Sequence, residues 1–474
     1  MFSITDGGLC RNCEGVSRRG FLRIGSLGLG ALGLGSLGLS GLLTARARAA
    51  AAGLPVRDRS VVLLFLQGGP SHIEMFDPKM DAPAEIRSTT GEVETTLPGV
   101  TFAGTFPRLG KLARRLAVVR SYATRNSGHT YQDVVSGRNR LKAAPGSLYA
   151  RVVGVNDPDS GMPSNALVLP EAIRPGLKLR NNFEAQALPG LTSPGQLGTV
   201  YGAFNPAGGS VLQQNLELRV PRGRFEDRRS LLRQLDRIRR DVESSGLLEA
   251  TDRYQQQAFD VINRGIAQAF DLSREDPRTL ERYDTSKLFR MEDLNRYNDM
   301  FRSSNLLGRQ MLLARRLCEA GCGFVTVADA GWDMHGNSNS LPRLTGMTPL
   351  GRQVDHAVSA FLEDVHERGL DERILLVITG EMGRTPRINK RGGRDHYGNL
   401  TTLVFAGGGL NMGQVIGRSD RHATRPATEP YGPEHLLATI MHTLFDVGKL
   451  RVTRNVPGDV VEIIAGDEPI RELF

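Results

Sequence analysis

Cysteine is scarce in this sequence, with four residues in 474, and tryptophan occurs once. Cys10 and Cys13 lie near the start of the chain, while Cys318 and Cys322 are four residues apart in a stretch with helical periodicity. Side chains at that helical spacing are often wrongly placed for a disulfide, so we expect two buried small residues there. The sequence therefore excludes a disulfide framework.

Basic blocks interleaved with aromatic residues are also missing, and no internal repeat is present. The net charge of +9 includes six arginines and two acidic residues in positions 1–49, which leaves +5 for residues 50–474. This modest excess suits anionic ligands or an anionic surface. Nucleic-acid binding is not expected.

A long uncharged stretch occurs only near the N-terminus. Paired arginines, Arg18 and Arg19, precede a Gly/Leu-rich run that is followed by the small-residue pattern Ala47-Arg48-Ala49. This arrangement is typical of a twin-arginine export signal. About 20 uncharged residues would also suit a transmembrane anchor, but the many Gly and Ser residues of the run favour the signal. We predict a signal peptide at residues 1–49, a periplasmic or secreted protein, and no stable membrane span after cleavage.

Residues 50–474 show apolar runs that alternate with helical periodicity. This alternation predicts one α/β domain with a mostly parallel central sheet and helices on both faces. Within it, residues 226–319 are polar, Arg-rich and largely free of Gly and Pro, which indicates a helical insertion or cap. Strands are predicted at residues 60–69, 115–122, 165–170, 322–330, 373–381 and 400–409.

The clearest helix is predicted over residues 348–369. Its apolar positions follow the spacing of a helix packed on a sheet. Thr348 is the expected N-cap, Pro349 the first helical residue, and Gly369 follows the end.

Polar and charged side chains follow the predicted strands. Because the carboxyl ends of parallel strands meet at one edge of a sheet, these side chains are expected to converge. Asp, Glu and His together suit a divalent metal such as zinc, manganese or iron. The candidates are His72, Ser127, His129, Asp333, His335, Glu381, Arg384, Arg394, Asp395 and His396.

Each candidate also has a purely structural interpretation. A lone His72 in a tight turn is more often a hydrogen-bonded turn residue, and Asp333 or His335 alone would serve as loop caps. Ser127 suits the N-cap of a helix that starts near His129. The arginines are either solvated or hold an anion. The co-occurrence of these residues at strand ends favours the metal site.

A family resemblance rests on the twin-arginine start and on the motifs "FLQGGPSHIEMFDPK", "GWDMHGN", "TGEMGRTP" and "GRDHYGN". In this order, over nearly all of residues 50–474, they resemble the secreted bacterial proteins called domain of unknown function 1501. That family is placed with the alkaline phosphatase and sulfatase clan. The resemblance implies an alkaline phosphatase-like α/β sandwich with a metal-centred hydrolytic site at the carboxyl edge of the sheet.

The resemblance also implies roles for individual residues. Ser127 matches the nucleophile position, Asp333 and His335 resemble paired ligands of one metal, and His396 resembles the last histidine ligand. Glu381 stands where the clan usually has the Asp of an Asp-His pair, but Met382 follows it. A thioether cannot replace an imidazole on a hard dication, so one full metal site and one impaired or altered site are expected. Further candidates are His72, His129 and Asp395 as additional ligands, and Arg384 and Arg394 for steadying the anion.

Two function classes follow. The first is a metal-dependent hydrolase of phosphate or sulfate esters that uses zinc, manganese, calcium or iron and acts on an anionic small-molecule or polysaccharide ester. The second is a catalytically degenerate clan member that binds a glycan, a sulfated polymer or a partner protein through the same cleft.

Overall fold

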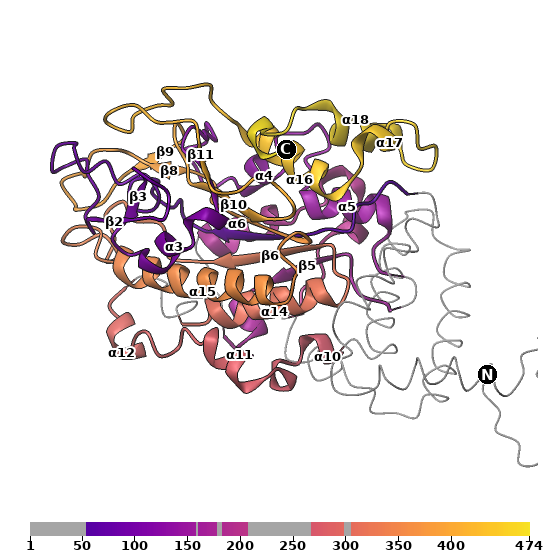
Figure 1. Cartoon of the computed structure of the whole chain (residues 1–474), viewed down its shortest axis with the longest axis horizontal. Coiled ribbons are helices and arrows are strands. Elements are labelled where there is room, and N and C mark those ends of the chain that lie inside the picture. Colours follow the sequence, from indigo (N-terminus) through magenta and orange to yellow (C-terminus); the bar gives the residue numbers. More distant parts are fainter. Residues whose placement is uncertain (1–53, 158–159, 178–182, 207–266, 298–304) are drawn as a thin grey trace, which may run out of the picture.

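A seven-stranded sheet forms the centre of the computed structural model (Figure 1). The structure describes residues 54–474 without 158–159, 178–182, 207–266 and 298–304. The strand order is β11-β4-β10-β7-β1-β6-β5. All neighbouring strands pair in parallel except β10, which runs antiparallel to β7 and β4. The strands are β1 (Ser60–Leu66), β4 (Ala117–Val119), β5 (Asn165–Val168), β6 (Phe324–Asp329), β7 (Ile374–Thr379), β10 (Leu403–Gly407) and β11 (Gln414–Ile416). The predicted α/β fold with a mostly parallel sheet is confirmed.

The central strand β1 shows why the sequence builds such a sheet. All seven of its residues are buried, and successive side chains point to opposite faces. Val62, Leu64 and Leu66 belong to one apolar core. Val61, Leu63 and Phe65 belong to the other. A strand covered on both faces therefore reads as a continuous apolar run.

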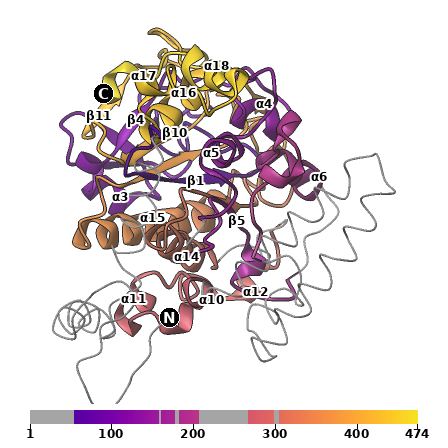
Figure 2. The same ribbon diagram turned by 90° about the vertical axis from the view of Figure 1, so that its right-hand side faces the viewer.

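Helices cover both faces of the sheet, as the turned view also shows (Figure 2). One core lies beneath α3 (Pro107–Lys111), α14 (Leu307–Glu319) and α15 (Met347–Glu367). The other core is closed by α4 (Tyr131–Val135), α5 (Pro145–Val153), α16 (Pro433–Leu444) and α18 (Gly458–Gly466).

The shorter elements complete the described chain. Two hairpins stand apart from the main sheet, β2 (Glu92–Glu94) with β3 (Thr101–Ala103) and β8 (Gly383–Arg384) with β9 (His396–Tyr397). Short helices are α6 (Phe183–Leu191), α10 (Ala267–Phe270), α11 (Pro277–Arg282), α12 (Met291–Leu294) and α17 (Val447–Leu450). The 3-10 turns are η1 (Ala113–Arg115), η2 (Pro170–Ala172), η3 (Gly195–Leu197), η4 (Thr199–Tyr201), η5 (Leu272–Arg274) and η6 (Arg471–Leu473).

The long helix α15 begins earlier than the sequence predicts. Met347 is its first residue and Gly346 its N-cap, so Thr348 as N-cap and Pro349 as first residue are wrong. Proline is tolerated anywhere in the first turn, because those backbone N–H groups have no partner within the helix, and the residue does not fix the exact start. The C-terminal prediction is close, with Glu367 last and Gly369 at φ +65° after the C-cap.

Two other predictions concern the N-terminal and central segments. The predicted signal peptide, residues 1–49, and residues 226–266 of the predicted insertion lie outside the described residues. From residue 267 onward the described part of this segment is largely helical, and its last helix, α14, packs against α15 and β6 in the layer that covers the sheet. Cys318 and Cys322 are both fully buried, as expected. Within the described ranges no helix is long and apolar enough to cross a membrane.

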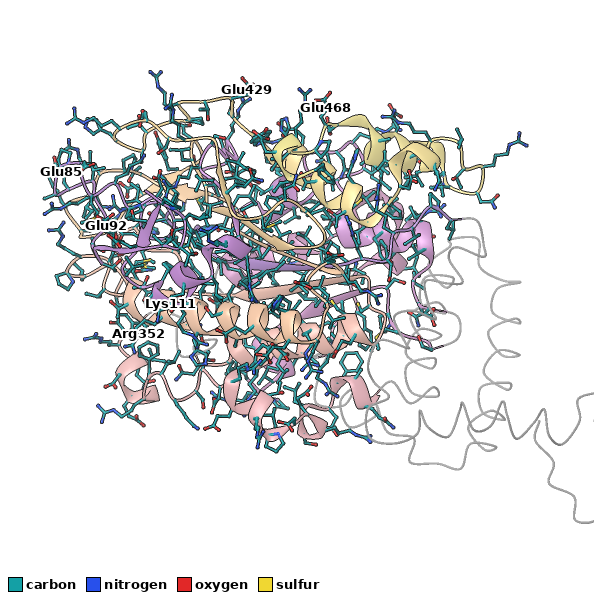
Figure 3. The ribbon with its side chains drawn as sticks, in the orientation of Figure 1. Glu85, Glu92, Lys111, Arg352, Glu429 and Glu468 are labelled. Atoms are coloured by element: carbon teal, nitrogen blue, oxygen red, sulfur yellow. The ribbon has the colours of Figure 1, made fainter. Side chains whose placement is uncertain are left out.

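Charged side chains of both signs lie on the outer surface. Those labelled in Figure 3 lie on the left-hand and upper sides of the view: Glu85, Glu92, Lys111, Arg352, Glu429 and Glu468.

Candidate metal centre

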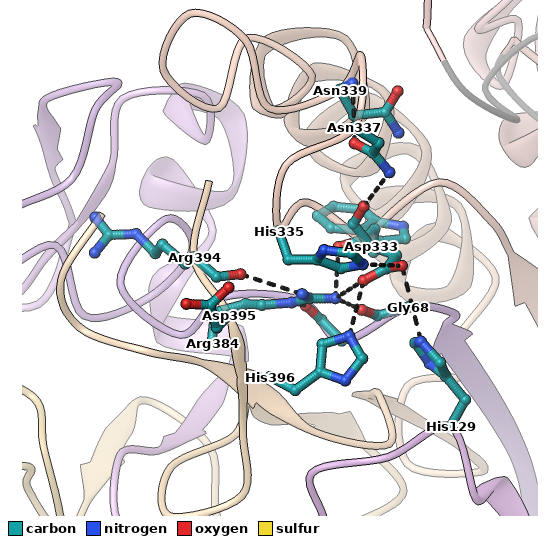
Figure 4. A network of polar contacts seen from close by, with 12 residues as sticks. Gly68, His129, Asp333, His335, Asn337, Asn339, Arg384, Arg394, Asp395 and His396 are labelled. Atoms are coloured by element: carbon teal, nitrogen blue, oxygen red, sulfur yellow. Dashed lines mark hydrogen bonds and ion pairs between the residues drawn. The ribbon is translucent and has the colours of Figure 1, made fainter. Parts of the chain in front are cut away.

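Five segments that are distant in sequence meet at one edge of the sheet. Gly68 follows β1, His129 follows β4, Asp333 follows β6, Glu381 follows β7, and His396 lies in β9 just before β10. The parallel strands end at this edge, and antiparallel β10 starts there. The reversed direction of β10 thus adds a loop at its start to those that follow the parallel strands. Figure 4 shows side chains from these loops close together, among them His129, Asp333 and His396.

His129, Asp333 and His396 form the core of the site, and we call them the metal triad. One ligand atom from each lies within 4.8 Å of the others. His396 Nε2 is 3.2 Å from Asp333 Oδ1, and His129 Nε2 is 3.8 Å from Asp333 Oδ2. The two imidazole rings meet edge to face, with centroids 4.7 Å apart.

Glu381 stands behind His129. Its Oε1 lies 2.8 Å from His129 Nδ1, and the carboxylate also accepts the backbone N–H of Gly68 at 3.0 Å. An ionised carboxylate only accepts hydrogen bonds. The proton of a neutral His129 therefore sits on Nδ1, and the lone pair on Nε2 faces Asp333.

His396 is oriented in the same way. Its Nδ1 lies 3.2 Å from the carbonyl oxygen of Ser127, which can only accept. The lone pair of a neutral His396 therefore also sits on Nε2, toward Asp333. Two imidazole lone pairs and a carboxylate facing one another are the donors that a divalent transition metal binds.

His335 lies beside the metal triad. Its Nε2 is 3.1 Å from Asp333 Oδ2, and its ring centroid is 5.1 Å from that of His396. It is more exposed than the two triad histidines, with 35% of its side chain accessible. His335 thus contacts the triad carboxylate from the solvent side without belonging to the triad.

Asp333 is held in its charged form. Burial alone would raise the pKa of its carboxyl, but the contacts with the His335 and His396 imidazoles and the charge of Arg384 hold that pKa well below its usual range. A carboxylate that stays ionised is a good metal ligand.

Arg384 is buried underneath Asp333 rather than exposed to a substrate. It is 1% accessible, and its Nη2 lies 2.6 Å from Asp333 Oδ1. Its Nε donates to the Gly69 carbonyl at 2.9 Å and its Nη1 to the Arg394 carbonyl at 3.2 Å. The Gly68 carbonyl accepts from Nη2 as well. The guanidinium is thus occupied in neutralising one triad oxygen and tying loops together.

Arg394 points away from the metal triad (Figure 4). It is fully buried and pairs with the equally buried Glu74, whose Oε1 is 2.7 Å from Nη2. It also donates to the carbonyls of Ile86 at 2.9 Å, Arg87 at 3.2 Å and Pro386. This side chain fixes the loop that carries His396.

The remaining predicted ligands stand outside the metal triad. Asp395 is exposed and accepts a hydrogen bond from Asn389 at 2.9 Å. His72 is buried with its Nε2 3.3 Å from the Ala423 carbonyl. Burial lowers the pKa of His72 to about 4, so its ring is neutral at pH 7.

The family model described as protein of unknown function (DUF1501) matches residues 58–474. The chain belongs to this family. The resemblance read from the motifs is therefore confirmed. No curated protein matches the chain.

Several solved structures are similar to this DUF1501 protein at low identity. A sulfatase from Pseudoalteromonas sp. shares 12% identity, covers 81% of this chain and 68% of its own, and has a TM-score of 0.32. A phosphonate monoester hydrolase from Silicibacter pomeroyi shares 11% identity over 87% of this chain and 78% of its own, with a TM-score of 0.29. A lipoteichoic acid synthase from Listeria monocytogenes shares 8% over 84% and 77%, also with a TM-score of 0.29.

Ser127 lies in the loop before α4 of this family member. Ser127 is exposed, and its carbonyl oxygen contacts His396 Nδ1. The alternative N-cap role is wrong, because α4 starts at Tyr131 with Thr130 at the N-cap. Asn126 shapes the loop instead, accepting from the Gly128 N–H at 3.2 Å and the Thr130 hydroxyl at 3.0 Å.

Asn126 and Met382 complete the surroundings of Glu381. Asn126 Nδ2 donates to the Glu381 carbonyl at 3.2 Å and so ties the His129 loop to the end of β7. Sequence reasoning missed this residue, although an Asn two positions before a Gly is a typical turn signal. Met382 is fully buried and packs against Gly69. A Cβ added to Gly69 would lie 2.7 Å from Met382 Cγ.

Proposed function

We propose that this protein is an exported, metal-dependent hydrolase of phosphate or sulfate esters. The observation that carries the proposal is the metal triad, in which both imidazole Nδ1 atoms are satisfied from behind and both Nε2 atoms face an ionised carboxylate. Such second contacts fix the ligands of metal sites and raise their basicity.

His129, Asp333 and His396 would hold the ion. An imidazole-rich set fits zinc, manganese or iron better than calcium, which prefers oxygen ligands. When bound, the ion supplies Lewis-acid stabilisation of the charge on an ester oxyanion.

The charges beneath the metal triad favour a cation. Asp333 and Glu381 carry one negative charge each, and Arg384 carries one positive charge. With neutral histidines the sum is −1, and all three charged side chains are buried. A divalent ion would turn this to +1, which suits an anionic ester.

The residues of the chain divide the remaining tasks. Glu381 keeps a proton on His129 Nδ1, and Arg384 balances Asp333. Ser127 is the proposed nucleophile, because it precedes His129 by two residues on an exposed loop that contacts His396. Its hydroxyl would lose its proton and attack the phosphorus or sulfur, which breaks the bond to the ester oxygen and releases the alcohol with a proton. Water would then attack the same phosphorus or sulfur, release inorganic phosphate or sulfate and regenerate the serine hydroxyl.

Export by the twin-arginine route is part of the proposal. It rests on Arg18, Arg19 and the Gly/Leu-rich run before Ala49. The expected location is the periplasm or the exterior, where anionic small molecules or polysaccharide esters would be the substrates.

A binding function without turnover is the second candidate. Ser127 contacts His396 through its carbonyl oxygen. Among the described residues, the Ser127 hydroxyl forms no hydrogen bond with the metal triad. A protein of this kind would hold a glycan, a sulfated polymer or a partner at the same edge of the sheet.

Metal analysis followed by an esterase assay tests the proposal. Purified protein should contain about one divalent ion per chain, and His129→Ala and His396→Ala should each lose it, because each removes one imidazole ligand. His366→Ala is the matched control, since this exposed histidine of α15 pairs only with Asp371 in the described structure. It should keep the ion.

Hydrolysis of aryl phosphates and aryl sulfates is then measured with zinc, manganese, calcium or iron supplied. Turnover by the wild type and its loss in both triad variants support the hydrolase. A protein that binds the ion but turns over neither ester class is a binding protein. A protein that binds no ion contradicts both the metal site and the hydrolase.

A further inference from the structure

The site needs a cation that can reach a substrate, and the two arginines first expected in that role cannot. Arg384 and Arg394 are buried, and their donors are occupied by carboxylates and backbone carbonyls. A third arginine, Arg391, lies in the turn between them and is exposed.

The turn of residues 389–393 packs on the loop that carries Asp333 and His335. Asn389 Nδ2 donates to the His335 carbonyl at 3.0 Å. Arg394 N donates to the Met334 carbonyl at 2.9 Å. The position of Arg391 relative to the metal triad is therefore fixed by hydrogen bonds on both sides of it.

Gly336 provides the place where the Arg391 side chain rests. A Cβ on Gly336 would lie 2.6 Å from Arg391 Nε and 2.7 Å from its Cζ, so the guanidinium lies directly against the glycine backbone. Gly336 has φ +146°, which also favours glycine. Its neighbour His335 lies 3.1 Å from the Asp333 carboxylate.

In the described part of the chain, Arg391 forms no ion pair. By contrast, the nearby exposed Arg387 pairs with Glu85 at 3.0 Å. An exposed guanidinium that rests on the backbone of the residue after His335 has donors free to bind an oxyanion in two hydrogen bonds.

We propose that Arg391 binds the tetrahedral oxyanion, shared by phosphate and sulfate esters, that occupies the metal triad. This inference rests on the proposed function and adds the residue that recognises its ligand. Gly336 has no side chain and so leaves room for the guanidinium.

Binding of inorganic phosphate and inorganic sulfate to the metal-loaded protein tests this inference without requiring turnover. Titration calorimetry should give a Kd for at least one anion that rises about tenfold in Arg391→Ala, the size expected for a charge-assisted hydrogen bond at a partly exposed site. Arg391→Lys should recover part of the loss, because it keeps the charge without the planar fork. The anion that shows the larger effect identifies the ester class.

Two further variants serve as controls. Arg387→Ala removes an exposed arginine four residues away and should leave the Kd unchanged. Arg125→Ala removes an exposed arginine next to Asn126, on the opposite loop. If Arg391→Ala leaves the Kd unchanged, whatever the effect of Arg125→Ala, or if the wild type binds neither anion, the assignment of Arg391 is wrong. Metal content, measured on the same samples, tests the metal site separately.

Discussion

Replacing Arg394 by methionine should destabilise the fold by about 3–5 kcal/mol, the range for breaking a buried ion pair from one side. Both Arg394 and its partner Glu74 are fully buried. The Oε1 atom of Glu74 receives Arg394 Nη2 at 2.7 Å and Nε at 3.2 Å, and methionine offers no donor in their place. The variant would leave a charged oxygen out of contact with water.

The other oxygen of Glu74 limits the effect. Its Oε2 accepts from the Ser88 hydroxyl at 3.0 Å and from the backbone and hydroxyl of Thr89, both at 2.9 Å. Half of the carboxylate therefore stays satisfied when Arg394 is removed. Since a domain is stable by only about 5–15 kcal/mol, the loss would still be a large part of the total.

Urea unfolding is the assay, and Trp332, the only tryptophan and a buried residue, is its fluorescent reporter. Glu74→Gln combined with Arg394→Met should be less destabilised than Arg394→Met alone, because the amide carries no charge. Arg387→Met is the control, since its exposed pair with Glu85 should contribute less than about 1 kcal/mol. If Arg394→Met loses no more than this control, or the double variant loses the sum of both single changes, the reasoning about the buried pair is refuted.

Three other predictions concern export, chemistry and pH. Replacing Arg18 and Arg19 by lysine should retain the uncleaved precursor in the cytoplasm; cell fractionation checks this, and normal export would contradict the signal. Ser127→Ala should abolish ester hydrolysis while leaving the metal content unchanged, and activity that survives would exclude Ser127 as the nucleophile. Burial raises the pKa of Asp329 to about 7. The stability that its protonated form provides is thus fully present below about pH 4 and is lost as the pH rises through about 7. Asp329→Asn should flatten the pH dependence of the urea midpoint in that window, and an unchanged slope would contradict the shift.

The sheet could be predicted because its buried strands appear in the sequence as continuous apolar runs. β1, β6 and β7 each lie inside a predicted segment and are buried throughout. The short hairpins, β2 with β3 and β8 with β9, have no such run, because their residues are partly exposed or only two to three in length. A strand of two or three residues is too short to show an alternating or apolar pattern, so the sequence does not identify it.

The sequence predicted which loops form the candidate site, but it did not predict which of their side chains contact one another. Asp333 and His396 were expected as ligands and lie in the metal triad, whereas His129 was a secondary candidate and also lies there. His335 and Glu381 stand beside it. Which side chain of a loop faces the centre depends on hydrogen bonds such as those of Asn126, which are set by the folded structure.

The burial of Arg384 and Arg394 could not be predicted either, because it also depends on contacts that form only in the folded structure. Both are arginines in polar, Gly-rich segments, where a solvated side chain is the usual outcome. Their buried partners, Asp333 and Glu74, come from loops that are far away in the sequence. A buried arginine can hold two loops together only after folding has brought those loops into contact.

The separation of the site residues along the chain has a consequence for biosynthesis. His129 and Glu381 are 252 residues apart, and Ser127 and His396 are 269 residues apart. A growing chain on the ribosome therefore has no complete metal triad until most of it has emerged, and no fragment that ends before β9 can hold the ion in this way. Because contacts of such long range form late in folding, the compartment in which the completed chain folds determines which metal ions are available to it.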